Sequence, residues 1–311
     1  MALIRGIYAA SMSILKDDLS LDVDKTILHS ENLIKQGCHG VAIFGSTGQS
    51  QLISINEKIK LISTLSDSKY KSSFIIGTGS NSLLDTINLM KHSKINGLDK
   101  FLLMPPAYYK YDDEGAYLFY AKIIEKIKDC KIILYNFEKL SGYKFSIDCV
   151  ERLVKDFSDQ IIGVKDSTYN LYEKLKINNF SVIPGSELKL LKGLEIGCSG
   201  IISATCNVTA ALSRKVYDDF QNKKPQTMNE KLCKVRRVFD KYNLISALHS
   251  YKSDNQSFFK RILPPLKLLD EKQHKKLVLE LKNLNFISED SFLIFSILDS
   301  DSFFLGLTDV D

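Results

Sequence analysis

Short apolar runs alternate with longer amphipathic stretches through the first two thirds of the chain. The apolar runs have the length of buried strands, and apolar residues between them recur at the spacing of a helix. The predicted strands are residues 4–12, 40–44, 74–76, 101–104, 131–135, a run that begins at 161 and ends with Lys165, 181–183 and 201–202. The predicted helices are residues 23–36, 55–65, 83–96, 114–127, 147–157, 171–177, 188–196 and 209–221.

Eight strand–helix units in succession are typical of a (β/α)8 or TIM barrel, an α/β fold with a closed parallel sheet. We therefore expect residues 1–224 to form a catalytic barrel. After Pro225 the pattern contains helices at 228–250 and 272–283, with no strands between them. Residues 225–311 are predicted to form a C-terminal helical extension, in which the stretch from about 291 has no assignment.

The composition is ordinary for a soluble globular protein, with 44% hydrophobic and 25% charged residues in a chain of 311. A net charge of +5 is spread along the chain without a long basic block, which argues against nucleic acid as a partner. No apolar run approaches the roughly 20 residues that span a bilayer, and the N-terminal residues show no signal region, so no membrane partner is expected.

The six cysteines are scattered and form no C-x-x-C pair, which argues against a zinc site. Such scatter suits reduced and mostly buried thiols, so we expect a cytoplasmic protein.

Lys165 stands at the end of an apolar run, which is an unusual place for a lysine. Burial favours the neutral form of a lysine because the charged form loses its hydration, and the neutral amine is a nucleophile. A desolvated lysine at a strand end is therefore a candidate for Schiff-base chemistry with a carbonyl substrate. The alternative, favoured when this stretch is taken by itself, is a lysine whose stem packs while its ammonium reaches solvent.

The residues that follow each strand are the other candidates, because active sites of such barrels lie at the carboxyl ends of the strands. The second strand is followed by a glycine-rich segment, residues 45–49, whose hydroxyls and backbone N–H groups are suited to a carboxylate. Later strands are followed by Tyr108, Tyr109, Tyr135, Asn136, Leu140, Ser141, Gly142, Gly185, Ser186, Glu187, Ser203, Ala204 and Asn207. Tyrosines at strand ends are more often packing residues of the rim than acid–base groups.

Taken together, these segments resemble the dihydrodipicolinate synthase / N-acetylneuraminate lyase family of class I aldolases. The similarity runs from Ala9 to about Leu281. The matching pieces are Gly45-Ser46-Thr47-Gly48, Gly77-Thr78-Gly79-Ser80-Asn81-Ser82, Pro106-Ala107-Tyr108-Tyr109, Tyr135-Asn136, Gly163-Val164-Lys165-Asp166-Ser167, Gly185-Ser186-Glu187, Gly200-Ile201-Ile202-Ser203 and Arg261-Ile262-Leu263-Pro264-Pro265-Leu266. The glutamate that usually follows Gly48 in the family is Gln49 here.

The resemblance implies that Lys165 attacks the keto carbon of pyruvate or another 2-oxo acid and that Tyr135 is the acid–base residue. It implies that Ser46 and Thr47 hold the pyruvate carboxylate and that Tyr108 completes a proton relay across a subunit interface. The catalytic residues are then Lys165, Tyr135, Tyr108 and Thr47, and the substrate-binding residues are Ser46, Thr47, Leu140, Ser167, Gly185, Glu187 and Ile202. The implied intermediate is a lysine–pyruvate imine without metal or organic cofactor, and the implied assembly is a homotetramer, a dimer of dimers.

Several positions depart from the family pattern and leave the second substrate open. Leu140 stands where synthases carry an arginine that binds the carboxylate of the aldehyde substrate, and the adjacent Lys139 is expected to point elsewhere. The segment around Leu140 looks more like the sialic acid lyase branch. That branch, however, has an Asp–Glu pair where Glu187 and Leu188 stand, and a serine where Ala204 stands.

The resulting hypothesis is a Schiff-base aldolase or lyase acting on pyruvate and an aldehyde, with a preference for a 2-keto-3-deoxy sugar acid or an N-acetylneuraminate-like substrate. One alternative is a dihydrodipicolinate synthase that condenses pyruvate with aspartate semialdehyde. An alternative of another class is a non-catalytic protein that binds 2-oxo acids on an enzyme scaffold, against which the joint presence of Lys165, Tyr135 and Tyr108 argues.

Overall fold

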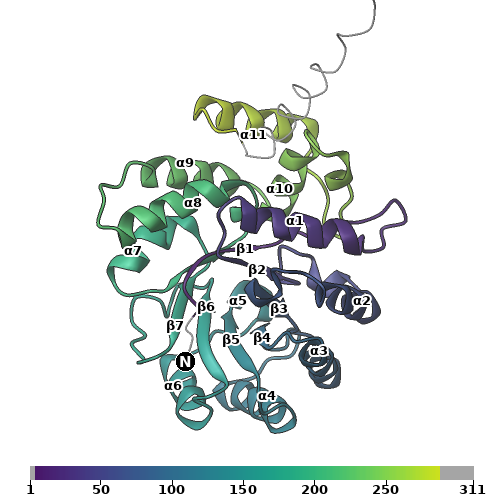
Figure 1. The fold of residues 1–311 in the computed structure, drawn as a ribbon, viewed down its shortest axis with the longest axis vertical. Coiled ribbons are helices and arrows are strands. Elements are labelled where there is room, and N and C mark those ends of the chain that lie inside the picture. The colour runs from purple at the N-terminus through teal and green to yellow at the C-terminus, as the bar shows by residue number, and fades with distance from the viewer. Residues whose placement is uncertain (1–3, 288–311) are drawn as a thin grey trace, which may run out of the picture.

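The computed structural model describes residues 4–287 and contains the predicted barrel of eight parallel strands (Figure 1). The strands are β1 Gly6–Ala10, β2 Gly40–Ile43, β3 Phe74–Gly77, β4 Lys100–Leu103, β5 Lys131–Asn136, β6 Ile161–Asp166, β7 Ser181–Pro184 and β8 Gly200–Ser203. They are ordered β7-β6-β5-β4-β3-β2-β1-β8. At the remaining gap the Ser199 N–H donates to the Val182 carbonyl at 2.9 Å, so the barrel is nearly closed.

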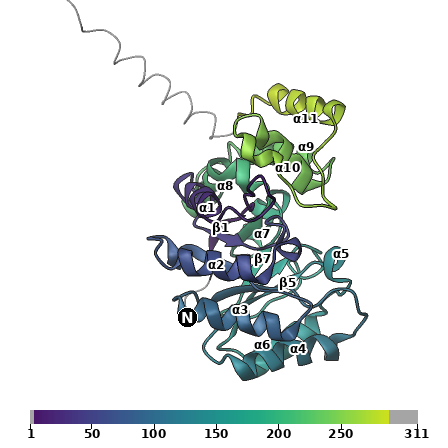
Figure 2. The ribbon, with the colours of Figure 1, turned by 90° about the vertical axis from the view of Figure 1, so that its right-hand side faces the viewer.

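Helices lie between successive strands except between β6 and β7, and they cover the outside of the barrel (Figures 1 and 2). The longer ones are α1 Val23–Lys35, α2 Ile55–Leu65, α3 Leu83–Ile95, α4 Asp113–Lys126, α6 Ile147–Asp156, α7 Leu190–Glu195 and α8 Cys206–Gln221. Short turns of helix are α5 Glu138–Ser141, η1 Ser50–Leu52, η2 Lys71–Ser73 and η3 Glu187–Lys189. Side-chain caps fix several helix starts; Ser54 and Glu57 form a reciprocal capping box on α2, which satisfies N–H groups that have no partner within the helix.

The strands bury both faces because successive side chains point in opposite directions. One set fills the barrel interior and includes Ile75, Leu102, Ile133, Ile183 and Ile202. The alternate residues, among them Ile76, Leu103, Leu134, Val182 and Ile201, pack with the helices in the larger outer core. This double burial explains why the strands appear in the sequence as continuous apolar runs rather than alternating ones.

The C-terminal extension consists of α9 Asn229–Phe239, α10 Leu244–Ser253, η4 Ser257–Lys260 and α11 Glu271–Asn283. Figure 2 shows α9, α10 and α11 gathered at one end of the molecule, beyond the strands. Their apolar core includes Met12 and Val208, so the extension packs on the barrel. The single helix predicted at 228–250 is two helices, because the chain breaks after α9 and Asn243 caps α10 by accepting from the Ser246 N–H.

The helix predicted at 171–177 is wrong, since that segment contains turns only. The buried Asp166 carboxylate accepts from the backbone N–H groups of Tyr169, Leu171 and Tyr172, and this fixes the chain in a tight turn. Tyr169 also adopts a positive φ of 64°, which interrupts a helical path. The unassigned stretch from about 291 lies outside the described residues, and the boundary at 224/225 stays a prediction.

All six cysteines lie in the described part of the chain as free thiols, five buried and Cys233 partly so. Within residues 4–287, no helix is both long enough and apolar enough to cross a bilayer.

Candidate active site

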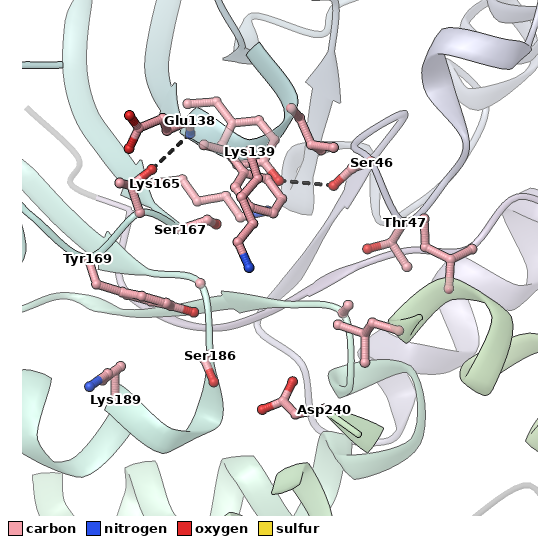
Figure 3. A pocket seen from close by; sticks show the side chains of 18 of the residues that line it. Ser46, Thr47, Glu138, Lys139, Lys165, Ser167, Tyr169, Ser186, Lys189 and Asp240 are labelled. Atoms are coloured by element: carbon pink, nitrogen blue, oxygen red, sulfur yellow. Dashed lines mark hydrogen bonds between the residues drawn. The ribbon is translucent and has the colours of Figure 1, made fainter. Parts of the chain in front are cut away.

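A cavity of about 620 Å³ opens at the carboxyl ends of the strands (Figure 3). It brings together seven of the residues predicted from sequence, which lie on or directly after four different strands, β2, β5, β6 and β7. These seven are Ser46, Thr47, Tyr135, Leu140, Lys165, Ser167 and Gly185. The barrel thus places side chains from distant parts of the sequence around one space, as its topology requires.

Lys165 and Tyr135 form the centre of this cavity. They are register partners on the neighbouring strands β6 and β5, and the Lys165 Nζ lies 4.2 Å from the centre of the Tyr135 ring. Lys165 is only 4% exposed, and no carboxylate within residues 4–287 forms an ion pair with its amine. The lysine amine is therefore held beside the tyrosine ring in a largely dehydrated position.

The Tyr135 hydroxyl lies 3.0 Å from Ser46 Oγ and is hydrogen-bonded to it (Figure 3). This contact fixes the phenol next to the lysine, where it can exchange a proton with a group attached to Nζ. Thr47 follows Ser46 and also lines the cavity, so both hydroxyls of the segment after β2 are available to a bound anion. The arrangement suits a small carboxylate held beside the lysine.

Asp166 anchors the loop that follows Lys165. Its carboxylate accepts from Asn136 Nδ2 at 2.8 Å as well as from the backbone N–H groups of the turn, among them Tyr169 at 2.8 Å. Ser167, the next residue, packs so closely against Gly185 that a Cβ at residue 185 would lie 2.3 Å from Ser167 Oγ. The absence of a side chain at Gly185 lets the β6 and β7 loops approach each other this closely.

The glycine-rich segment after β2 is held from the C-terminal extension. The buried Gln49 adopts a positive φ of 55°, its Oε1 accepts from the Leu263 N–H at 2.8 Å, and its Nε2 lies 3.3 Å from His249 Nε2. His249 Nδ1 must donate to the Phe259 carbonyl, 2.9 Å away, so Nε2 of the neutral ring accepts from Gln49. Burial lowers the pKa of His249 to about 4, and a glutamine amide matches this neutral ring.

Three predicted site residues lie away from the cavity lining. Tyr108 is 88% exposed and adopts a positive φ of 83°, and its ring contacts the adjacent Tyr109 edge to face. Ile202 is fully buried in the barrel interior. Glu187 is fully buried and accepts from Ser203 Oγ at 2.7 Å and from Arg236 Nη1 at 3.0 Å.

Residues of the extension also reach the cavity, and no sequence motif indicated them. Arg236 on α9 and Asp240, the residue that follows the last one of α9, line it, and the Arg236 Nε donates to Asp240 Oδ1 at 2.8 Å. Burial alone would raise the pKa of Glu187, but the Arg236 guanidinium and the neighbouring hydroxyls hold it below its usual value. Conversely, Glu187 and Asp240 raise the pKa of Arg236 above its usual value although burial opposes this. Arg236 and Asp240 have the i, i+4 spacing of an ordinary surface pair, and only the packing of α9 on the barrel places them at the cavity.

The structure also corrects the expectation for Lys139. This residue lies on the short helix α5 rather than in an open loop, and it lines the cavity together with Leu140. Figure 3 shows its amine pointing into the space. Among the described residues, no group of three or more His, Cys, Asp or Glu side chains is placed to hold a metal ion.

A barrel that buries a lysine at the end of its sixth strand has the arrangement of a Schiff-base-forming lyase. A model of the dihydrodipicolinate synthetase family matches residues 3–284, and the chain therefore belongs to that family. Its members are pyruvate-dependent aldolases and lyases, and this chain is an enzyme of that class.

Two curated relatives show the range of names within the family. A 4-hydroxy-tetrahydrodipicolinate synthase of Methanothrix thermoacetophila is 29% identical over 281 residues, covering 87% of this chain and 94% of the relative. An uncharacterized DapA-like lyase of Pyrobaculum arsenaticum is 26% identical over 300 residues, covering 89% and 98%. Among solved structures, YagE of E. coli K12 in complex with pyruvate superposes with a TM-score of 0.84 at 23% identity, covering 92% of this chain and 100% of YagE. This last similarity supports the fold.

Proposed function

We propose that this enzyme makes or breaks a carbon–carbon bond between pyruvate and an aldehyde with a neutral, hydroxylated tail, through an imine at Lys165. The observation that carries the proposal is the pairing of Lys165 with Tyr135 in the cavity, with Nζ 4.2 Å from the ring centre. The buried amine supplies the nucleophile, and the phenol, bonded to Ser46, supplies a movable proton.

In the first half-reaction the Lys165 amine adds to the keto carbon of pyruvate, and loss of one water gives the imine. Protonation of the imine nitrogen turns the former carbonyl into an electron sink. The Tyr135 oxygen, deprotonated after giving its proton to the departing water, then accepts a proton from the adjacent methyl carbon, and an enamine results. Ser46 and Thr47 hold the pyruvate carboxylate during these steps, which removes orientational freedom from the reacting atoms.

In the second half-reaction the enamine carbon attacks the aldehyde carbon, and the aldehyde oxygen takes up one proton to become a hydroxyl. Tyr135 transfers this proton to the aldehyde oxygen, and water then hydrolyses the imine to release the 2-oxo acid and the free Lys165 amine. Cleavage follows the same steps in reverse. No metal or organic cofactor enters the scheme, because the covalent imine supplies the electron sink.

The preference for a neutral tail rests on Leu140. Leu140 lines the cavity and offers no donor, so a carboxylate on the second substrate finds no bidentate partner there. Ser167, which also lines the cavity, offers a hydroxyl instead. We therefore propose a 2-keto-3-deoxy sugar acid, or a compound like it, as the product of condensation or the substrate of cleavage.

A second candidate is the condensation of pyruvate with aspartate semialdehyde, the reaction of a dihydrodipicolinate synthase. The Lys139 amine pointing into the cavity favours it, because this cation is placed to pair with a substrate carboxylate. A lysine ammonium is a point charge, whereas an arginine guanidinium offers two parallel N–H donors to a carboxylate. Pairing of the substrate carboxylate with Lys139 would therefore be less specific than pairing with an arginine.

Tyr108 and Tyr109 give reason to propose an assembly. Both are large, apolar and strongly exposed, and Tyr108 keeps an unfavourable backbone conformation. We propose that they contact a second copy of the chain, that Tyr108 completes the proton relay of the partner, and that the assembly is a homotetramer in the cytoplasm.

The direct test is reductive trapping. Incubation with pyruvate and borohydride should add one reduced adduct, which peptide mass spectrometry should map to Lys165. The Lys165→Arg variant should form none, because a guanidinium stays charged. An adduct at another lysine, or no adduct on the wild-type protein, would favour the non-catalytic alternative over the proposed aldolase.

A further inference from the structure

The wall of the cavity that comes from the C-terminal extension carries a carboxylate with a free oxygen. Asp240 lines the cavity, and its side chain is 36% exposed. Arg236 Nε donates to Asp240 Oδ1, whereas no donor within residues 4–287 bonds to Oδ2. A carboxylate oxygen that faces a substrate cavity is a strong acceptor for a hydroxyl hydrogen.

The position of this carboxylate is fixed by a buried network behind it. The Arg236 side chain is only 8% exposed, and its Nη1 donates to Glu187 at 3.0 Å, to Ser203 Oγ at 3.1 Å and to Thr205 Oγ1 at 3.3 Å. These hydrogen bonds fix the Arg236 side chain in one conformation. Its Nε then holds the Asp240 carboxylate in place. Such support lowers the conformational freedom that a surface aspartate would lose on binding a ligand.

The charge of the network decides which substrate tail it suits. Arg236 contributes one positive charge and lies between two carboxylates, those of Glu187 and Asp240. The three side chains together carry a net negative charge, which repels a substrate carboxylate and attracts hydroxyl hydrogens.

The other cations of the lining do not cancel this charge. Figure 3 shows the Lys189 amine directed away from the centre, and its Nζ lies 5.6 Å from the centres of the Tyr169 and Tyr172 rings. Lys139 and Asp240 enter the cavity from opposite sides.

We propose that Asp240, positioned by Arg236 and Glu187, is a specificity-determining residue that binds the hydroxyl groups of a neutral polyhydroxylated aldehyde. This inference rests on the proposed function, because it concerns the second substrate of the same cavity. It also gives Glu187 a role: Glu187 acts on the substrate only through Arg236, which explains its burial away from the lining.

The experiment compares three aldehydes as partners of pyruvate: D-glyceraldehyde, propanal and aspartate semialdehyde. Propanal has the carbon chain of glyceraldehyde without its two tail hydroxyls. The Asp240→Ala variant should lower the ratio of kcat/KM for glyceraldehyde to that for propanal by about 10- to 100-fold, the range for a lost hydrogen bond to a charged group. Asp240→Asn should shift the ratio of glyceraldehyde to aspartate semialdehyde toward the anionic aldehyde.

The matched control is Asp218→Ala on α8. Asp218 forms an i, i+4 pair with Arg214 of the same type, similarly exposed, but outside the cavity. This control should keep the wild-type ratios, which separates the loss of a helix-surface pair from the loss of a substrate contact.

Borohydride trapping of the pyruvate adduct is measured on every variant. A wild-type protein without an adduct would overturn the proposed function. A normal adduct with both aldehyde ratios unchanged in the Asp240 variants would overturn this inference alone. So would a wild-type protein that uses propanal as well as glyceraldehyde.

Discussion

Tyr135 and Lys165 stand directly opposite each other on adjacent parallel strands, and the lysine amine lies over the tyrosine ring. The backbone pairing of β5 and β6 sets this relationship, so it does not depend on flexible loops. The proposed acid–base group and the proposed nucleophile are therefore held in one geometry before a substrate binds, which is the condition under which proximity lowers a barrier.

Removing the Tyr135 hydroxyl should separate imine formation from turnover. We expect Tyr135→Phe to lower kcat by roughly 10² or more, because a positioned acid–base group typically contributes that much. The measurement is steady-state kinetics with the best aldehyde found. Tyr117→Phe, which removes a hydroxyl bonded to Asp156 on the surface, is the control and should turn over normally. A Tyr135→Phe variant as active as the wild type would remove Tyr135 from the mechanism.

The role proposed for Tyr108 can be tested by mixing subunits. Tyr108→Phe should reduce kcat less than Tyr135→Phe, because Tyr108 acts on the partner through a relay. If both variants are inactive, mixed and reassembled subunits should recover part of the activity, since some cavities then receive both hydroxyls. The equally exposed neighbour supplies the control, and Tyr109→Phe should behave as wild type. Recovery that fails although mixed oligomers form would place Tyr108 outside the relay.

An arginine at position 140 should shift the substrate preference. Leu140→Arg puts a guanidinium into the cavity lining, and we expect kcat/KM for aspartate semialdehyde to rise about tenfold or more through bidentate pairing with its carboxylate. Both aldehydes are assayed on the same preparation. Leu118→Arg adds the same charge on the exposed face of α4 and should change neither. An unchanged preference in Leu140→Arg would indicate that Lys139 or another cation already determines it.

Asp166 should matter for stability as well as for activity. Its carboxylate accepts from five donors, namely Asn136 Nδ2 and the N–H groups of Thr168, Tyr169, Leu171 and Tyr172. In Asp166→Asn a side-chain NH2 group replaces one carboxylate oxygen, so the N–H groups that this oxygen accepted from lose their acceptor. The substitution should lower the free energy of unfolding by about 2–4 kcal/mol. Urea denaturation measures this, with Asp159→Asn on an exposed turn as the control. A loss below 1 kcal/mol, a rough threshold for one ordinary hydrogen bond, would show that the loop does not need this anchor.

Stability should fall in mild acid because of His249. Burial lowers the pKa of this histidine from 6.5 to about 4 in the folded protein. Between pH 6.5 and pH 4 the histidine is therefore protonated in the unfolded chain and neutral in the folded one. Stability is then lost as the pH falls from 6.5 to 4, by about 3 kcal/mol. Urea denaturation at a series of pH values should show this slope in the wild type and a smaller slope in His249→Gln. His92→Gln, on α3, serves as the control and should keep the wild-type slope. Equal slopes in wild type and His249→Gln would contradict the assignment.

The hydrophobic pattern and the residues at the strand ends were enough to predict the barrel and the meeting of Lys165 with Tyr135. Strands that are buried on both faces appear in the sequence as short, continuous apolar runs. The helices between them show apolar residues that recur at helical spacing. Lys165 and Tyr135 could be found because the ends of parallel strands meet at one edge, so position along the chain fixes position in space. The prediction of a helix at 171–177 was wrong because the Asp166 carboxylate accepts from backbone N–H groups of that segment.

The packing of the C-terminal extension on the barrel decides which further side chains lie at the cavity. Glu187 turns away from the cavity to pair with Arg236, 49 positions later, and Gln49 meets His249 across 200 positions. The helix α9 brings Asp240 to the opening, whereas its pattern in the sequence is that of an ordinary amphipathic helix. Such contacts depend on how the C-terminal extension packs on the barrel, and local periodicity carries no information about the packing of segments so far apart.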